Sequence, residues 1–254
     1  MTSLSLIKAI ICDMDGVILR DHHLLPGAKE FIENLLKGPI PFVFLTNYPS
    51  QTPSEQKHRL GISGVHVPEE HFYTSAMATA AFLENQTGRT AYVIGESGLT
   101  HELYKIGFTL TDVEPDFVIV GETRAYNWDM IYKASKLINQ GSRFIATNPD
   151  VVGPDGSPSC GSLCAPIERI TKKAPFYIGK PNPWMMRAAL KKLQAHSEDT
   201  VIIGDNMSTD IVAGIQAGMQ TILVLTGVTK EEDLIQYPFR PHHIFPCVGD
   251  IDLF

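Results

Sequence analysis

Four apolar runs along the chain end abruptly in polar or charged residues, and helical patterns lie between them. Such runs predict buried strands, and strands that alternate with helices predict a parallel sheet built from strand–helix–strand units. The carboxyl ends of parallel strands meet at one edge of a sheet, so polar residues at those ends are expected to gather there. The residues at the four ends are Asp13 and Asp15, Thr46 and Asn47, Lys180, and Asp205 with Asp210.

Helix signals fill the stretches between the strands. They consist of apolar residues at helical spacing, with proline near a start or glycine just after an end. Helices are predicted over residues 26–38, 74–83, 99–105, from Asn127 to Gly141, after Pro183 and over 211–217. Further strands are predicted over residues 90–95, 116–121, 142–148, 176–178 and 221–227. The tail from Asp233 onward is expected to cover the core.

The middle of the chain predicts a second domain. Residues 78–177 hold enough alternating strands and helices to form an α/β unit of their own. A chain of 254 residues is long for one compact domain and suits two. We therefore expect an α/β fold in which residues 1–77 and 178–254 form a discontinuous core with a parallel sheet, and residues 78–177 form an inserted α/β domain.

Composition narrows the possible partners. Lys and Arg total 21 against 28 Asp and Glu, and the net charge of −7 argues against a nucleic-acid polymer or an anionic membrane as partner. The amino-terminal run contains Lys8 and lacks a small-residue cleavage site, so it predicts a strand and no signal peptide. No apolar run has the length of a membrane span. We expect a cytoplasmic protein that is a monomer or a small homo-oligomer.

The cysteines do not predict a disulfide framework or a zinc site. There are four in the chain, and only Cys160 and Cys164 lie close together in sequence. No second pair and no histidine cluster completes a metal site around them. We expect these two residues to be buried, reduced thiols.

The acidic pair at the first strand end allows two interpretations. Asp13 and Asp15 repel each other unless a cation lies between them or one is protonated, so they indicate a hard metal such as Mg²⁺, a split in pKa, or both. The same pattern is common in plain turns, where an aspartate caps the turn and a glycine such as Gly16 takes positive φ.

The other three strand ends also allow a structural and a chemical interpretation. Thr46 and Asn47 can cap the next helix or donate hydrogen bonds to an anion. Lys180 can be a solvated charge, although its Gly and Pro neighbours fix its backbone. Asp205 and Asp210 bracket a turn with hydroxyl residues that leads into a helix, which is an anion site or a helix cap. Together the four ends supply what phosphoryl transfer needs: metal ligands, neutral donors and a cation.

The order of the four motifs resembles the haloacid dehalogenase superfamily of phosphatases. These motifs are Asp-x-Asp-Gly-Val, Leu-Thr-Asn, Gly-Lys-Pro and Gly-Asp-x-x-x-x-Asp. The long insertion between the second and third motifs is similar to the large α/β cap, type IIA, of one subfamily. Segments that begin at Tyr73, Gly121, Tyr126, Ala146 and Gln194 extend the resemblance to bacterial ribonucleotide monophosphatases within that subfamily.

The resemblance implies a Rossmann-like core with an inserted cap and a role for each acid. Asp13 would be the nucleophile and would form an aspartyl-phosphate. Asp15 would be the general acid toward the leaving alcohol and then the general base toward water. Mg²⁺ would be held by the Asp13 carboxylate, the backbone carbonyl of Asp15 and the Asp205 carboxylate. Asp210 would orient the lysine or a metal-bound water.

The resemblance also implies a set of residues that bind phosphate or substrate. These are Asp15, Thr46, Asn47, Lys180, Asn206, Met207, Ser208 and Thr209. Ser208 stands where an arginine is expected in near relatives, so the charge on the substrate side is left open. Residues 147–150 and 159–162 of the cap are candidates for substrate contact, and ordinary loop turns are the alternative.

The implied activity is Mg²⁺-dependent hydrolysis of small phosphorylated metabolites, above all of ribonucleoside 5′-monophosphates such as UMP and GMP, with a broad range. A sugar-phosphate or pyridoxal-phosphate phosphatase is the alternative among enzymes. A non-catalytic protein that binds nucleotides or phosphate is the alternative from another class. The complete set of Asp13, Asp15, Thr46, Lys180 and Asp205 argues against the last of these.

Overall fold

The computed structural model describes residues 7–252, and the chain divides into two compact units. The first unit contains the chain up to Thr46, Pro53–Tyr73 and the chain from Lys180 onward. The second contains Asn47–Thr52 and Thr74–Gly179. Residues 47–52, 74–77 and 178–179 thus group with the second unit, whereas the sequence placed them in the core.

Backbone hydrogen bonds explain why the segment after Thr46 groups with the second unit. The carbonyl of Ser50 accepts from the amide of Gly98 at 3.1 Å. The carbonyl of Asn47 accepts from Ser75 Oγ at 2.5 Å and from Asn148 Nδ2 at 2.9 Å. The chain therefore passes into the second unit directly after β4, returns, and passes into it again after β5.

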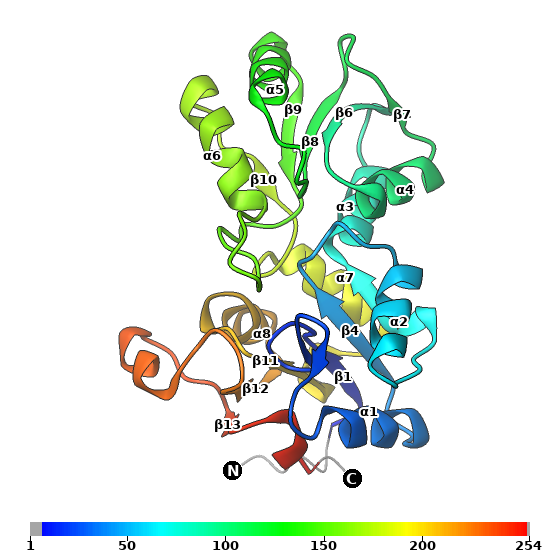
Figure 1. Ribbon diagram of the computed structural model, residues 1–254, viewed down its shortest axis with the longest axis vertical. Coiled ribbons are helices and arrows are strands. Elements are labelled where there is room, and N and C mark those ends of the chain that lie inside the picture. Colours follow the sequence, from blue (N-terminus) through cyan, green and yellow to red (C-terminus); the bar gives the residue numbers. More distant parts are fainter. Residues whose placement is uncertain (1–6, 253–254) are drawn as a thin grey trace. The chain divides into compact units, whose positions relative to one another are not determined.

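The first unit is built on a six-stranded sheet (Figure 1). Its strand order is β13-β12-β11-β1-β4-β5, and β1 pairs in parallel with both β4 and β11. β12 pairs in parallel with β11 and with β13. The strands are β1 (Ala9–Cys12), β4 (Phe42–Thr46), β5 (Phe72–Thr74), β11 (Thr200–Gly204), β12 (Gln220–Val224) and β13 (His243–Phe245). This order is the parallel α/β core that the sequence predicts.

Helices cover the sheet of the first unit because its strands are apolar on both faces. Alternate strand residues pack in one cluster with apolar residues of α1 (Ala28–Lys37) and with Leu60 of α2 (Pro53–Ile62). On the other face lies α8 (Val212–Ala217), where Gly214 approaches the side chains of Ile202 and Thr221 so closely that a Cβ would not fit. α7 (Pro183–Leu193) packs against α8 and β4.

The second unit has its own five-stranded sheet with the order β10-β9-β8-β6-β7, and all its strand pairs are parallel. The strands are β6 (Thr90–Ile94), β7 (Thr109–Leu110), β8 (Phe117–Val120), β9 (Arg143–Ala146) and β10 (Phe176–Tyr177). Apolar residues of the sheet form one cluster with those of α5 (Trp128–Gln140) and α6 (Cys160–Thr171). α3 (Ser75–Glu84) and α4 (Ser97–Lys105) pack against each other.

Most sequence-predicted elements are present with bounds within a few residues of the prediction. Asn127 caps α5 as expected, since its side chain accepts from the amide of Met130. Gly16 has a φ of 85°, which confirms the sharp turn after β1. Cys160 and Cys164 are buried free thiols on α6. The sequence pattern did not predict α2, the short pair β2 (Leu19–Arg20) and β3 (His23–Leu24), or the short strands β5, β7 and β13.

Within residues 7–252, none of the helices combines the length and the hydropathy that a bilayer span requires.

Candidate active site

Lys180 lies at the centre of a charged cluster in the first unit. Its side chain is only 2% exposed, and its Nζ donates to Asp13 Oδ1 at 2.6 Å, to Asp210 Oδ1 at 2.7 Å and to the carbonyl of Leu45 at 3.2 Å. Three acceptors match the three protons of an ammonium group. Lys180 is therefore a buried, fully bonded cation, and the solvated charge that the sequence left open is excluded.

Asp13 brings the first carboxylate to this cluster because it follows β1 directly. Its amide donates to the carbonyl of Ile203 at 2.8 Å, which extends the pairing of β1 with β11 by one residue. Oδ1 accepts from Lys180, whereas Oδ2 accepts no hydrogen bond from any residue between 7 and 252. One carboxylate oxygen is thus anchored, and the other is available to a ligand.

Asp205 follows β11 in the same way, and two glycines make room for it. A Cβ on Gly16 or on Gly227 would overlap Asp205 Oδ2. The amide of Val228 donates to this oxygen at 2.6 Å. The glycine at position 16 therefore has a second role besides the sharp turn: its lack of a side chain leaves room for the carboxylate of Asp205.

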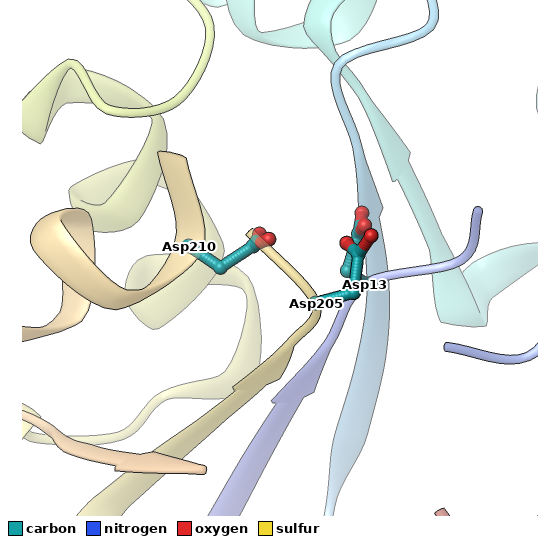
Figure 2. Close-up of side chains that lie close together, drawn as sticks. All are labelled: Asp13, Asp205 and Asp210. Carbon is teal, nitrogen blue, oxygen red and sulfur yellow. The ribbon is translucent and has the colours of Figure 1, made fainter. Parts of the chain in front are cut away.

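Asp210 reaches the cluster from a short π-helical segment, Met207–Ile211, that follows β11. It is fully buried, and its Oδ2 accepts from the amide of Asn206 at 3.2 Å. Gly204 lies so close to Asp210 that a Cβ would overlap its side chain. Figure 2 shows Asp13 and Asp205 at the ends of neighbouring strands, with Asp210 directed toward them.

The cluster has an excess of negative charge in a buried place. Burial raises the pKa of Asp13 well above its usual value, although the charge of Lys180 opposes this. Burial and the charge of Asp210 raise the pKa of Asp205 to about 7. Burial disfavours a charged Lys180, yet the charges of Asp13 and Asp210 raise its pKa above the usual value. One ammonium therefore offsets only part of the charge of three carboxylates.

This excess of charge fits a divalent cation. Carboxylate oxygens of Asp13, Asp205 and Asp210 all lie within 4.8 Å of one another. The backbone carbonyl of Asp15 accepts no hydrogen bond from the part of the chain that the structure describes. Carboxylate and carbonyl oxygens are the ligands of Mg²⁺. The donors that the sequence analysis assigned to Mg²⁺ are therefore of the right chemistry, and Asp210 adds a third carboxylate.

Asp15 has a partner that the sequence analysis missed. Its Oδ1 accepts from Nη2 of Arg59 at 2.7 Å, so its side chain is part of an ion pair and is not part of the three-carboxylate cluster. Arg59 lies in the last turn of α2. No motif marks this arginine, since only the fold brings α2 to the turn after β1.

The two residues of the second strand end lie in different units. Thr46 is the buried last residue of β4 in the first unit. Asn47 belongs to the second unit, where its Nδ2 donates to Asp150 Oδ2 at 2.8 Å. The side chain of Asn47 is thus hydrogen-bonded to Asp150, which is itself one of the candidates for substrate contact.

The segment after Asp205 divides into packing residues and accessible ones. Met207 is fully buried in an apolar cluster with Ile211 and Leu223, and its amide donates to Thr229 Oγ1 at 3.0 Å. Met207 therefore packs the core and is left out of the binding set proposed below. Ser208 is exposed, and its hydroxyl lies 3.0 Å from that of Tyr237.

The second unit has a buried polar cluster at the carboxyl ends of its strands. Glu122 follows β8, and its Oε1 accepts from Ser159 Oγ and from Asn148 Nδ2. Burial raises the pKa of Glu122, although both hydrogen bonds oppose the shift. Asn148 also donates to the carbonyl of Asn47. Of the cap candidates, Asn148 and Ser159 are therefore buried and bonded within their own unit.

Comparisons with known proteins agree with this geometry. The family model described as haloacid dehalogenase-like hydrolase matches residues 10–109, and a second model described as HAD-hydrolase-like matches residues 177–251. These two ranges contain all four strand-end motifs.

Curated relatives match over nearly the whole chain. The chain is 58% identical to the ribonucleotide monophosphatase NagD of Escherichia coli K12 over 97% of this chain and 99% of that one. It is 47% identical to a dihydroxyacetone phosphatase of Corynebacterium glutamicum over 95% of this chain and 89% of that one. It is 35% identical to the 5′-nucleotidase YutF of Bacillus subtilis over 93% and 94%. The solved structure of E. coli NagD superposes with a TM-score of 0.94 and covers 98% of this chain and 99% of that one.

Proposed function

The chain belongs to the haloacid dehalogenase-like hydrolases and is a phosphatase, and on that premise we propose that it cleaves phosphomonoesters through an aspartyl-phosphate on Asp13. One observation carries this proposal. Asp13 has one oxygen anchored by the buried Lys180 and the other free of hydrogen bonds from the described residues, in a cluster that fits a divalent cation.

In the first half of the reaction, an oxygen of Asp13 attacks phosphorus while the bond from phosphorus to the leaving oxygen breaks. Asp15 donates a proton to that oxygen, so the product leaves as a neutral alcohol. In the second half, Asp15 takes a proton from a water molecule whose oxygen attacks phosphorus. The bond between phosphorus and Asp13 then breaks, which releases phosphate and regenerates the free carboxylate.

The cation of this reaction is Mg²⁺. We assign it to the carboxylates of Asp13 and Asp205 and to the backbone carbonyl of Asp15, with Asp210 beside them. When bound, Mg²⁺ offsets the charge of the carboxylates and stabilises the negative charge that develops on the phosphoryl group. Lys180 orients Asp13 through its 2.6 Å hydrogen bond.

Phosphoryl and substrate binding are assigned to the remaining strand-end residues. Thr46 donates to a phosphoryl oxygen through its hydroxyl group. Lys180 adds its positive charge, because its three protons are already donated to Asp13, Asp210 and the carbonyl of Leu45. We assign Asn206, Ser208 and Thr209 to the substrate side next to Asp205. Asp210 fixes the lysine, since its Oδ1 accepts from Lys180 at 2.7 Å.

Ribonucleoside 5′-monophosphates are the substrates that we propose, on the strength of the 58% identity to the E. coli ribonucleotide monophosphatase. Small sugar-type phosphates are a second candidate, which the 47% identity to a dihydroxyacetone phosphatase supports. The neutral hydroxyl pair of Ser208 and Tyr237 suits either class, because both present hydroxyl groups near the phosphate.

A substrate panel with Mg²⁺ tests the proposal. It compares kcat/KM for UMP, GMP, dihydroxyacetone phosphate, glucose 6-phosphate and pyridoxal phosphate. We expect the highest values for UMP or GMP, no phosphate release with excess EDTA, and none from the Asp13→Asn variant. Highest values for dihydroxyacetone phosphate would favour the second candidate. Normal turnover by Asp13→Asn would show that Asp13 is not the nucleophile.

A further inference from the structure

We propose that Arg59 positions the side chain of Asp15 for proton transfer during phosphomonoester cleavage. This inference rests on the proposed function, since it takes Asp15 as the general acid and base. Arg59 touches none of the reacting atoms in this role, and it acts through the carboxylate that it holds.

The contacts of Arg59 form a bridge between two turns of the first unit. Nη2 donates to Asp15 Oδ1 at 2.7 Å and to the carbonyl of Asp21 at 2.6 Å. Nε donates to the same carbonyl at 3.1 Å. Because two nitrogens of the planar guanidinium donate to one carbonyl oxygen, the orientation of its plane is fixed independently of the bond to Asp15.

The guanidinium joins the turn that contains Asp21 to the end of α2. Asp21 lies in the turn between β2 and β3, with a φ of 56° in the left-handed region. Arg59 itself lies in the last turn of α2, which is pinned to the core by the fully buried Leu60. A cation is also favoured at this end of a helix.

The ion pair differs from an ordinary surface pair. The side chains of Arg59 and Asp15 are only 12% and 14% exposed, whereas those of Lys57 and Glu69, joined by an ion pair from the same helix, are 53% and 48% exposed. Exposed pairs of that kind contribute little to stability. The burial of Arg59 and Asp15 makes their contact short and directional.

The geometry leaves one oxygen of Asp15 for chemistry. Oδ1 is held by Arg59, and Oδ2 accepts no hydrogen bond from the described residues. A carboxylate that lies between a strand end and a glycine turn is otherwise able to rotate about its side-chain bonds. With one oxygen fixed, the other can give and take a proton from a constant position.

The test compares two leaving groups. An alkyl phosphate such as UMP needs a proton on its leaving oxygen, whereas 4-nitrophenyl phosphate loses a stable phenolate without one. The quantity to compare is kcat/KM, because it reports the steps up to the release of the alcohol and excludes the later hydrolysis of the aspartyl-phosphate. The variants are Arg59→Met, Arg59→Lys and Asp15→Asn, with Lys57→Met as the control on the same helix.

For Arg59→Met, we expect kcat/KM to fall at least about 10-fold with UMP and to stay within about 3-fold with 4-nitrophenyl phosphate, since general acid catalysis contributes about 10²–10⁴-fold. Asp15→Asn should show the same selectivity with a larger loss. Arg59→Lys keeps the charge without the fork and should recover part of the loss. Lys57→Met should behave as the wild type.

The two proposals can fail separately. Equal losses with both substrates in Asp15→Asn would overturn the role of Asp15 as the general acid in the proposed mechanism, and with it this inference. A selective loss in Asp15→Asn together with equal or absent losses in Arg59→Met would overturn only the role of Arg59. If Arg59→Met does not fold, Arg59→Lys replaces it in the test. The role of Arg59 is then overturned if kcat/KM of Arg59→Lys falls equally with both substrates or does not fall with UMP.

A double variant separates positioning from direct binding of the phosphate. If Arg59 acts only through Asp15, adding Arg59→Met to Asp15→Asn causes no further loss with UMP. A further loss of the same size as in the single variant would mean that Arg59 acts independently of Asp15.

Discussion

The ammonium nitrogen of Lys180 lies 2.6 Å from Oδ1 of Asp13, although 167 residues separate the two along the chain. The same nitrogen bonds Asp210, so one lysine holds two acids that arise from different motifs. Lys180 thereby connects residues from three of the four sequence motifs: its own, that of Asp13 and that of Asp210.

Replacing Lys180 by Met is expected to destabilise the first unit by about 3–5 kcal/mol, because it leaves buried carboxylates without their cation. Urea unfolding in EDTA measures this change. Lys8→Met is the control, since Lys8 forms an exposed ion pair with Asp199 and its loss should cost less than about 1 kcal/mol. Equal effects of the two variants would contradict the part of Lys180 in the cluster.

Mg²⁺ is expected to stabilise the protein and to do so through Asp205. Binding to the folded state alone raises the free energy of unfolding by about 2.7 kcal/mol when the ion is at 100 times its dissociation constant. Thermal unfolding with and without Mg²⁺ measures this. Asp205→Asn should lose the effect and Asp199→Asn should keep it. If Mg²⁺ stabilised Asp205→Asn as much as the wild type, Asp205 would not be a ligand of the ion.

Gly227→Ala is expected to displace Asp205, because the new Cβ would overlap the carboxylate. Phosphate release should fall at least about 10-fold as the metal ligand moves. Gly61→Ala in α2 is the control, because its Cβ would lie 3.7 Å from the nearest atom, in the ring of His66. Removing a helical glycine should stabilise the protein by up to about 1 kcal/mol. Full activity of Gly227→Ala would show that the carboxylate has room to shift.

Glu122 is expected to make stability depend on pH. Its pKa in the folded state is raised above the ordinary value of 4.5, so between that value and the raised one the folded state binds more protons than the unfolded state. The free energy of unfolding therefore falls as pH rises through this window. The contribution is complete below the unfolded pKa and is lost above the folded one.

The Glu122→Gln variant tests this sign. The amide oxygen of Gln can still accept from Ser159 and Asn148, and no charge is buried. Urea unfolding at mildly acidic and at neutral pH should show that the stability of the variant, relative to the wild type, increases toward neutral pH. If the relative stability of the variant decreased over the same pH range, the pKa of Glu122 would be lowered in the folded state and not raised.

The sequence predicted the parallel core, the separate α/β unit and the strand-end residues, because each depends on a local pattern. Apolar runs, glycines after helices and polar residues at strand ends are all visible within about ten positions. The convergence of Asp13 and Asp205 then follows from the rule that parallel strands end at one edge of a sheet. That rule does not account for Lys180, because the strand before it, β10, belongs to the other sheet.

What the sequence could not predict depends on tertiary contacts. Arg59 lies on a helix with a weak apolar pattern, and its contact with Asp15 spans 44 residues. Met207 stands among polar residues, but the π-helical segment turns it into the core. Asn47 follows Thr46 directly, yet its hydrogen bonds assign it to the other unit.

The strand order of the first unit also bears on how the chain folds during synthesis. β1 leaves the ribosome before its partner β4, which follows about 30 residues later. Its other partner, β11, begins only at Thr200. The nascent chain must therefore carry β1 with one edge unpaired while the whole second unit is made. Pairing over so long a separation is slow, so this edge of β1 stays open to incorrect pairing until β11 has been made.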